Sequence, residues 1–188
     1  KSDMAPSLIT ADILCLTRMY ASWSVKALQS SKGGKVLSSK DRITYFGLEY
    51  GFLSNFWPSK VVLDSVEYST VEHAFQAAKT HDPLWRENIR SQHNPGRAKR
   101  LGRTLSLRDD WEEVKVGVMR DLLQQKFRAG GHLASLLLQT GEAFLLEGNT
   151  WHDNVWGSCC CYRCKDGGEN KLGQLLMTIR EELRAVGT

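Results

Sequence analysis

The segment of this sequence whose side chains are best suited to carry out a reaction is 69–79, STVEHAFQAAK. If it is helical, Glu72, Gln76 and Lys79 have the i, i+4 and i+7 spacing of one helix face. A carboxylate can move a proton or stabilise a cation, and a lysine amine can act as a nucleophile. A structural interpretation competes with this, because Ser69 and Glu72 also have the spacing of a capping box. The residues alone favour the capping box, with Lys79 as a solvated surface lysine.

Two further segments combine polar and aromatic residues. In 148–158, GNTWHDNVWGS, Asp153 is a second candidate carboxylate and Trp156 a candidate stacking surface. In 53–58, LSNFWP, the amide of Asn55 adjoins aromatic side chains. Asn and Asp are also the usual turn residues, so both segments could be ordinary loops. Trp111 follows helical spacing and is more typical of a core than of a ligand platform. Lys126, on the same predicted helix, is expected to be a solvated lysine.

A basic run without carboxylates extends from Arg90 to Arg108. Arginine binds phosphate through two parallel hydrogen bonds, so this run could hold a pyrophosphate or a nucleic-acid backbone. A solvated basic face explains it equally well. The six basic residues are Arg90, Arg97, Lys99, Arg100, Arg103 and Arg108.

Four of the five cysteines fall within residues 159–164. An odd count clustered in one loop does not resemble a secreted disulfide framework, and indicates a reducing compartment. Structural zinc normally uses two separated pairs of ligands, whereas only Cys161 and Cys164 form a spaced pair here, with His152 nearby. We therefore expect no metal and interpret these residues as oxidation-prone loop cysteines.

Length and composition are those of an ordinary globular protein. The chain has 188 residues, of which 41% are hydrophobic and 24% charged, and its net charge is +4. These values exclude disorder, collagen and a coiled coil, and no stretch is apolar enough to span a membrane. Residues 1–40 are predicted to form a helix (7–29) and a Gly/Ser/Lys-rich linker (30–40), outside the main domain at 41–188. We expect an intracellular protein, cytoplasmic or nuclear, with organellar targeting by residues 1–40 left open.

The pattern of turns and caps predicts a mainly α-helical domain with a small antiparallel sheet near its start. The predicted strands are 43–46 and a hairpin over 60–69 that turns at Asp64-Ser65, and 143–146 is predicted to be a brief buried strand or turn. The predicted helices are 69–80, one opened by Asp82-Pro83, one from Asn94-Pro95 to Gly102, 109–128, 131–139 and 171–185, the last capped by Asn170. A loop over 150–168 precedes the last helix.

Six segments, in order, resemble the NADAR family of YbiA-like domains and together cover about 43–185. They are FLSNFWP (52–58), YSTVEHAFQAAK (68–79), AKRLGR (98–103), WEEVKVGVMRDLLQQKF (111–127), DNVWG (153–157) and GENKLGQLLMTIR (168–180). The resemblance implies a mainly helical glycohydrolase that cuts N-glycosidic bonds. Its substrate would be ADP-ribose on guanine bases of nucleic acid, or a ribosylamino-pyrimidine phosphate intermediate of riboflavin synthesis. A non-catalytic ADP-ribose-binding module and a zinc-dependent nucleic-acid-binding protein are the remaining alternatives.

Carried over by position, the resemblance implies a site and now favours a catalytic Glu72 over the capping box. The expected catalytic residues are Glu72, Lys79 and Asp153. The expected substrate contacts are Asn55, Phe56, Gln76, Arg103, Trp111, Trp156, Gly157 and Asn170. We expect no cofactor, no metal, no membrane contact and no obligate protein partner. One departure bears on the substrate, because relatives carry a glycine-rich loop where this chain has SCCCYRCK at 158–165.

Overall fold

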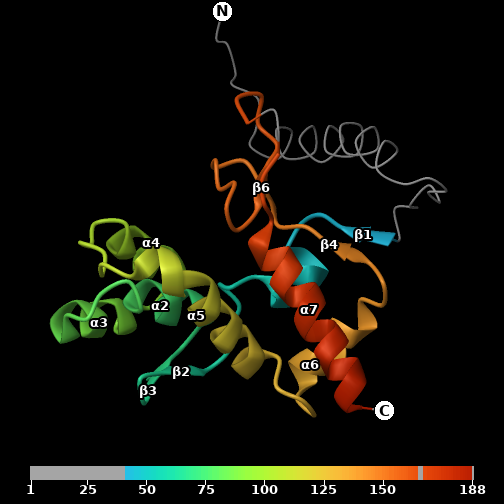
Figure 1. Ribbon diagram of the computed structural model, residues 1–188, viewed down its shortest axis with the longest axis horizontal. Helices are drawn as coiled ribbons and strands as arrows, with labels where there is room; N and C mark the ends of the chain where they lie inside the picture. The colour runs from blue at the N-terminus through green and yellow to red at the C-terminus, as the bar shows by residue number, and fades with distance from the viewer. Residues whose placement is uncertain (1–40, 165–166, 188) are drawn as a thin grey trace, which may run out of the picture. The chain divides into compact units, whose positions relative to one another are not determined.

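The computed structural model describes residues 41–164 and 167–187 (Figure 1). The predicted N-terminal helix and linker lie outside the described residues. The described chain divides into two compact units, one formed by 41–46 and 142–177, the other by 47–141 and 178–187. In this part of the chain no helix is long and apolar enough to cross a membrane.

The unit formed by 47–141 and 178–187 is mainly helical, as predicted. Its elements are the 3-10 helix η2 (Leu48–Leu53), strands β2 (Val61–Leu63) and β3 (Val66–Tyr68), and helices α2 (Val71–Ala77), α3 (Pro83–Arg90), α4 (Pro95–Gly102), α5 (Trp111–Lys126) and α6 (His132–Gln139). The second half of α7 (Lys171–Val186) also belongs to it. The sequence did not predict η2.

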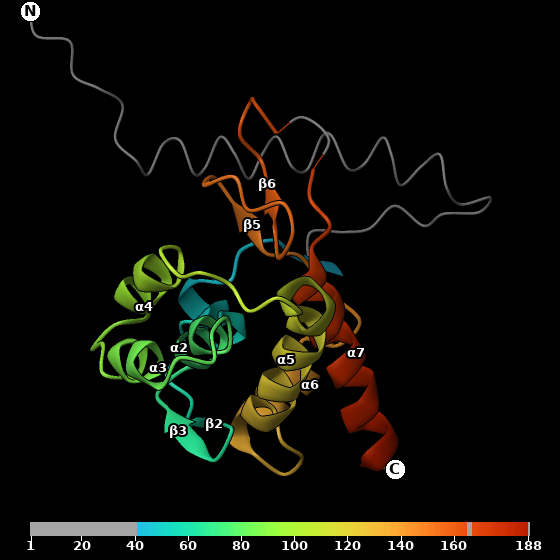
Figure 2. The same ribbon diagram turned by 60° about the vertical axis from the view of Figure 1, so that its left-hand side comes forward.

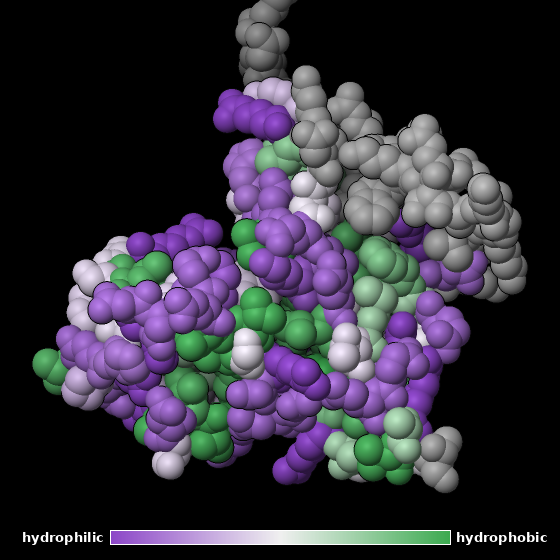
Figure 3. Space-filling view, in the orientation of Figure 1, coloured by the Kyte–Doolittle hydropathy of each residue, from purple (hydrophilic) through white to green (hydrophobic). Residues whose placement is uncertain are grey.

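The β2–β3 hairpin confirms the predicted turn. Its strands are antiparallel, with Val61 opposite Tyr68. Asp64 and Ser65 both have positive φ, at 49° and 67°, as a tight two-residue hairpin turn requires. Val61 and Tyr68 are buried while the outward face of the hairpin is exposed. In Figure 3 apolar surface gathers over this hairpin, whereas the surface over α3 and α4 is largely hydrophilic.

Helix starts in this unit follow local capping chemistry. Oδ1 of Asp82 accepts the N–H of Leu84 at 2.8 Å, and Oδ1 of Asn94 accepts the N–H of Arg97 at 2.9 Å. Each cap precedes a proline in the first turn, as predicted.

The predicted start of α2 is wrong by one residue. Thr70, not Ser69, is the N-cap, and its Oγ1 accepts the N–H of His73 at 3.2 Å. Glu72 therefore does not stand at the third helical position that a capping box requires. Glu72 stands instead at the second helical position, so the predicted capping-box spacing is not met.

Helix α2 lies at the centre of its unit and packs against α3, α4 and α5 (Figure 2). Every residue of α2 is buried, including the polar residues Glu72, His73 and Gln76. The closest approach is to α4, where a Cβ added at Gly102 would lie 1.8 Å from Oε1 of Gln76. Burying polar groups is unfavourable unless they are hydrogen-bonded or serve a ligand.

The other unit contains two short parallel strand pairs, where the sequence predicted only antiparallel pairing. Strand β1 (Arg42–Ile43) pairs with β4 (Phe144–Leu145), and β5 (Gly148–Asn149) pairs with β6 (Ser158–Cys159). The first half of α7 completes this unit, and Leu172 and Leu176 on it are fully buried. The prediction failed because these pairs join residues that are distant along the chain, which no local turn signal reports.

Candidate active site

The carboxylate of Glu72 is the centre of a buried polar cluster on α2. Oε1 of Glu72 accepts a 2.9 Å hydrogen bond from Nε2 of Gln76, one helical turn later. Both side chains are only 4% exposed. The backbone N–H of Glu72 donates to the carbonyl of Asn55 at 3.0 Å, which joins the start of α2 to the 54–57 loop. The shared helix face predicted from sequence is therefore present for Glu72 and Gln76.

Lys79 lies two residues beyond the last residue of α2, in the turn that follows the helix, and is half-buried. Its backbone N–H donates to the carbonyl of Gln76 at 3.3 Å, and its own carbonyl accepts from Arg108 at 2.8 Å. Burial lowers the pKa of the Lys79 ammonium, the Glu72 carboxylate raises that pKa, and Lys99 and Arg103 lower it again. The outcome is a lysine with a pKa below the ordinary value and a carboxylate within electrostatic range.

The 54–57 loop is clamped from two sides. Nζ of Lys126 donates to the carbonyl of Ser54 at 2.6 Å, and Nδ2 of Asn55 contacts Sδ of Met119 at 3.5 Å. Phe56 and Trp57 are each 40% exposed. A loop this firmly anchored presents an aromatic surface at low entropic cost to a ligand.

Two buried oxygen atoms in the cluster lack hydrogen-bond donors among the described residues. They are Oδ1 of Asn55 and Oε1 of Gln76. A buried acceptor without a donor destabilises the fold by about 1–3 kcal/mol. Asn55 and Gln76 were both predicted as substrate contacts, but in this structure the two oxygens are closed to solvent, and Oε1 of Gln76 packs against Gly102.

The basic run 90–108 is only partly available for phosphate. Arg90 donates two 2.7 Å hydrogen bonds to Glu87, and Arg108 pairs with both carboxylate oxygens of Asp110. The side chains of Arg97, Arg100 and Arg103 form no ion pair with any described residue, and all three are exposed. Nζ of Lys99 lies 5.8 Å from the ring centroid of Phe56, in cation–π range.

Trp111 is a buried residue that packs against helix α2. Its side chain is 5% exposed and packs against Phe75, with ring centroids 5.1 Å apart and an interplanar angle of 55°. This tilted pair fixes α2 against the start of α5. Unlike Trp111, Phe56 and Trp57 are exposed.

The burial of Lys126 could not be predicted from the sequence. Its position on α5 suggested a solvated lysine, but it is only 4% exposed, and burial lowers its pKa to about 7. The prediction of an exposed Lys126 is wrong because its partner, the carbonyl of Ser54, lies 72 residues earlier in the chain. No local sequence pattern predicts such a contact.

The unit that contains 142–177 holds the remaining predicted site residues. Oδ1 of Asp153 accepts the backbone N–H groups of Val155 at 3.2 Å and Trp156 at 2.9 Å. The amide of Asn149 bonds the backbone of Asp153 through both its atoms, at 2.7 and 3.1 Å. Asp153 therefore fixes the turn that carries Trp156, which is half-buried, and Gly157. A Cβ at Gly157 would lie 2.3 Å from the carbonyl of Glu147, so only glycine fits.

Asn170 has its side chain committed to backbone groups. Nδ2 donates to the carbonyl of Leu145 at 2.8 Å, and Oδ1 accepts from the N–H of Glu147 at 3.0 Å. Its side chain is 2% exposed. Asn170 thus ties the segment after β4 to the start of α7, and its φ of 54° is consistent with a tight helix entry.

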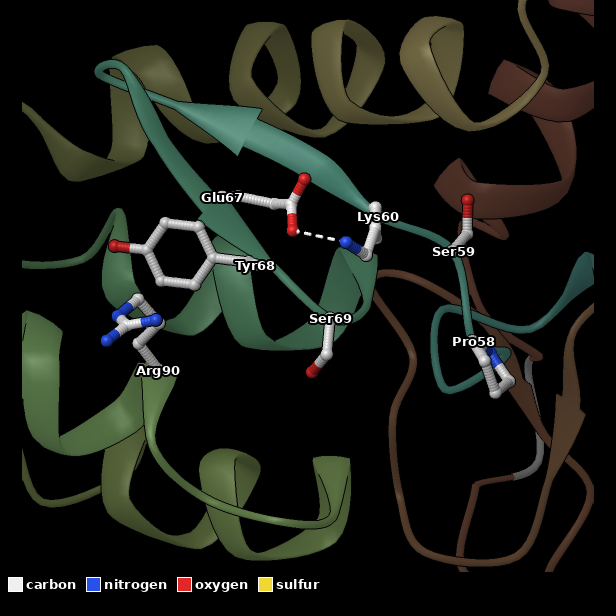
Figure 4. A pocket seen from close by; sticks show the side chains of 7 residues that line it. All are labelled: Pro58, Ser59, Lys60, Glu67, Tyr68, Ser69 and Arg90. Atoms are coloured by element: carbon white, nitrogen blue, oxygen red, sulfur yellow. Dashed lines mark ion pairs between the residues drawn. The ribbon is translucent and has the colours of Figure 1, made fainter.

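A separate cavity of about 460 Å³ lies beside the hairpin (Figure 4). It is lined by Pro58, Ser59, Lys60, Glu67, Tyr68, Ser69 and Arg90. Figure 4 shows the ammonium of Lys60 directed at the carboxylate of Glu67, an ion pair of 2.8 Å. None of the predicted catalytic residues lines this cavity. Its two basic side chains already form ion pairs, Lys60 with Glu67 and Arg90 with Glu87. It is therefore not the candidate active site.

Comparisons with known proteins give one consistent result. A sequence profile of the NADAR domain matches residues 44–184. The N-glycosidase YbiA of Escherichia coli strain K12 is 45% identical over 143 residues, 72% of this chain and 82% of that protein. A riboflavin biosynthesis protein of Vibrio vulnificus is 35% identical over 141 residues, 72% of this chain and 36% of that protein.

The fold agrees with the same family. The NMR structure of E. coli YbiA superimposes with a TM-score of 0.67 at 37% sequence identity, and covers 80% of this chain and 89% of that one. Both the mainly helical fold and the family resemblance predicted from sequence are confirmed. The chain belongs to the NADAR domain family.

Proposed function

We propose that the protein is an N-glycosidase that removes ADP-ribose from guanine bases of nucleic acid. The observation that carries the proposal is the buried, hydrogen-bonded pair of Glu72 and Gln76 on α2, followed by the half-buried Lys79, whose lowered pKa is influenced by the Glu72 carboxylate. N-glycosidase is also the name of the E. coli relative at 45% identity. Hydrolysis of an N-glycosidic bond uses the groups that this face offers.

Glu72 is the proposed acid–base residue. Cleavage develops positive charge at C1 of the ribose, which a nearby carboxylate stabilises electrostatically, as in glycoside hydrolysis. The hydrogen bond from Gln76 fixes the position of the carboxylate. In this role the carboxylate takes a proton from the attacking nucleophile. With Thr70 as the N-cap, Glu72 does not have the spacing of the capping box that was the alternative to this role.

Lys79 is the proposed nucleophile in a two-step route. Its neutral amine attacks C1 of the opened ribose, the C1–N bond to the base breaks, and the base nitrogen takes a proton and leaves. The resulting imine between Lys79 and C1 is then hydrolysed by water, which returns the free amine and releases the sugar as an aldehyde. Lowering the pKa of Lys79 raises the fraction of neutral amine at pH 7.

Asp153 is the proposed second carboxylate. Its Oδ1 atom is occupied by the backbone N–H groups of its own turn. Its catalytic role is proposed from the family resemblance, because Asp153 and Glu72 belong to different units. The same turn presents Trp156, the proposed stacking surface for the base.

Substrate recognition is assigned to aromatic and basic groups. Phe56 and Trp57 offer exposed rings to a nucleobase. Asn55 and Gln76 remain proposed substrate contacts on the basis of the family resemblance. The diphosphate would be bound by Arg103 and its neighbours on α4, whose guanidinium groups match phosphate geometry. The residues 41–188 are neutral in net charge, so contact with a nucleic acid is expected to be local and only modestly salt-dependent.

A second candidate substrate is a ribosylamino-pyrimidine phosphate. It is favoured by relatives named as riboflavin biosynthesis proteins, from Vibrio vulnificus and from maize at 34% identity. Such a substrate has the same ribose–nitrogen bond and a phosphate, so the chemistry of Glu72 and Lys79 would be unchanged. The difference lies in what surrounds the base.

The substrate is tested by direct competition. Guanine-linked ADP-ribose on a short DNA strand and a ribosylamino-pyrimidine phosphate are each incubated with the full chain, and release of the sugar is followed by mass spectrometry. The proposal expects faster turnover of the DNA substrate by at least tenfold. Faster turnover of the pyrimidine would reassign the substrate within the same reaction class, and binding of ADP-ribosylated DNA without product would identify a non-catalytic reader.

A further inference from the structure

The cysteine-rich loop of the unit formed by 41–46 and 142–177 brings four potential metal ligands together. Nδ1 of His152 lies 3.3 Å from Sγ of Cys161, 3.3 Å from Sγ of Cys164 and 3.9 Å from Sγ of Cys159. All four ligand atoms lie within 4.8 Å of one another. The sequence predicted no metal here because one spaced cysteine pair is too few, and it missed that His152 folds back onto the cysteines.

The backbone explains why these side chains converge. The parallel β5–β6 pair sets Asn149 beside Cys159, and the N–H of Cys160 donates to the carbonyl of Asn149 at 2.9 Å. The N–H of Cys164 donates to the carbonyl of Cys161 at 3.2 Å, which closes the Cys-x-x-Cys turn. His152 has a φ of 66°, a strained conformation that a non-glycine residue keeps only where its surroundings demand it.

We propose that His152, Cys159, Cys161 and Cys164 bind one Zn²⁺ ion in a structural site. Three thiolates and one imidazole are a zinc ligand set. Bonds of about 2.3 Å to sulfur and about 2.0–2.1 Å to nitrogen in a tetrahedron place ligand atoms about 3.6–3.8 Å apart. The spacing of the cluster matches this, and the three cysteines are free thiols, not a disulfide.

The site is structural because the protein supplies all four ligands. A catalytic zinc keeps one position open for water or substrate. Here the ion would instead tie the loop end at Cys161–Cys164 to the turn at His152. That turn leads directly into Asp153, whose carboxylate holds the backbone of Val155 and Trp156. Zinc binding would therefore stabilise the turn that carries Trp156, and this inference does not depend on the proposed reaction.

The test begins with the metal content of the intact chain. The full-length protein is purified under reducing conditions from zinc-supplemented cells, and its metal is measured by inductively coupled plasma mass spectrometry and zinc-edge X-ray absorption. The proposal expects one zinc per chain, with three sulfur ligands and one nitrogen ligand. Less than one tenth of a zinc per chain, both as purified and after incubation with zinc, would overturn it.

Variants locate the ion. Cys164→Ser and His152→Ala are expected to lower zinc content or affinity by at least tenfold, while Cys160→Ser, outside the four ligands, retains one zinc per chain. Because a variant could misfold, cobalt substitution of the wild type gives an independent readout, and tetrahedral cobalt–thiolate absorption is expected. Zinc retained by both ligand variants, or octahedral cobalt in the wild type, would contradict the assigned ligands.

Discussion

Nε2 of Gln76 donates a 2.9 Å hydrogen bond to Oε1 of Glu72, and the backbone of Gly102 packs against the far side of the same glutamine. The position of the Glu72 carboxylate thus depends on a contact between α2 and α4. In our proposal this contact orients the acid–base group. Its consequences can be measured at a residue that does not itself react.

Gly102→Ala is expected to reduce activity by displacing Gln76. The added Cβ would lie 1.8 Å from Oε1 of Gln76, so the side chain must move and the hydrogen bond to Glu72 is lost. We expect kcat to fall at least tenfold, because misorientation affects the chemical step more than binding. Steady-state kinetics with a thermal unfolding curve measures both effects.

The matched control for that experiment is Gly117→Ala. A Cβ at Gly117, within α5, would meet nothing within 4 Å. The change should stabilise the protein by about 0.5–1 kcal/mol, because alanine favours helix over glycine, and leave kcat unaltered. Equal kcat for Gly102→Ala and Gly117→Ala would contradict the orienting role of Gln76.

The pH dependence of turnover is expected to depend on the charges around Lys79. Activity that needs the neutral amine rises with pH through the pKa of Lys79, and the positive charge of Arg103 lowers that pKa. Arg103→Gln should therefore raise the pKa and move the ascending limb of kcat to higher pH. Arg100→Gln, a change to an exposed residue on the same helix that does not shift the Lys79 pKa, should leave the limb in place.

The Lys79 assignment also predicts a covalent adduct. Borohydride added during turnover should trap the sugar on the chain, and peptide mapping should locate it at Lys79. Suppose that Arg103→Gln leaves the ascending limb of kcat unmoved and that no lysine adduct forms. The reaction then proceeds by direct attack of water, and Lys79 is not the nucleophile.

The parts of the fold that the sequence predicts well are those with local causes. Asp64 and Ser65 form the expected hairpin turn, and Asp82 and Asn94 cap the expected helices. The position of the α2 cap was wrong because Ser69 and Thr70 are adjacent hydroxyl residues that sequence spacing alone does not distinguish. That one-residue error changed the interpretation of Glu72, since the capping box depends on an i, i+3 relationship.

Burial of Lys126 predicts an unusual dependence of stability on pH. The pKa of about 7 in the folded protein lies well below the ordinary 10.5, so the unfolded chain binds a proton that the folded chain releases between these values. Stability therefore rises with pH across this window. From pH 7 to pH 9 the gain from this group is about 2 kcal/mol.

Lys126→Met isolates that contribution. The variant loses the hydrogen bond to the carbonyl of Ser54 but also the buried titrating group. Its unfolding free energy, measured with urea at pH 7 and pH 9, should lack the gain of about 2 kcal/mol shown by the wild type. The same increase in both proteins would show that Lys126 does not titrate in this range.

In our proposal Asp153 has two roles, which two substitutions separate. Asp153→Asn keeps an oxygen that can accept from Val155 and Trp156, so stability should match the wild type while kcat falls at least tenfold. Asp153→Ala should lose activity and also about 1–2 kcal/mol of stability. Full activity in Asp153→Asn would restrict Asp153 to holding its turn.

Contacts between residues that are far apart in the chain could not be predicted from local sequence patterns. The burial of Lys126 depends on Ser54, and the pairing of β1 with β4 joins residues about 100 positions apart. The approach of His152 to Cys161 and Cys164 depends on the β5–β6 pair and on a left-handed backbone at His152. The residue types of the candidate site could be read from the motifs, whereas their hydrogen bonds and pKa shifts required the packing of α2 against α4 and α5.

The measurement that tests the account most directly is release of ADP-ribose from guanine-linked ADP-ribose DNA by wild type, Glu72→Gln and Glu113→Gln. Glu113 is an exposed glutamate on α5 and serves as the matched control. We expect the kcat of Glu72→Gln to fall at least 100-fold with an unchanged fold by circular dichroism, whereas Glu113→Gln should retain wild-type turnover. Wild-type turnover by a folded Glu72→Gln protein would contradict the central claim that this carboxylate performs the chemistry.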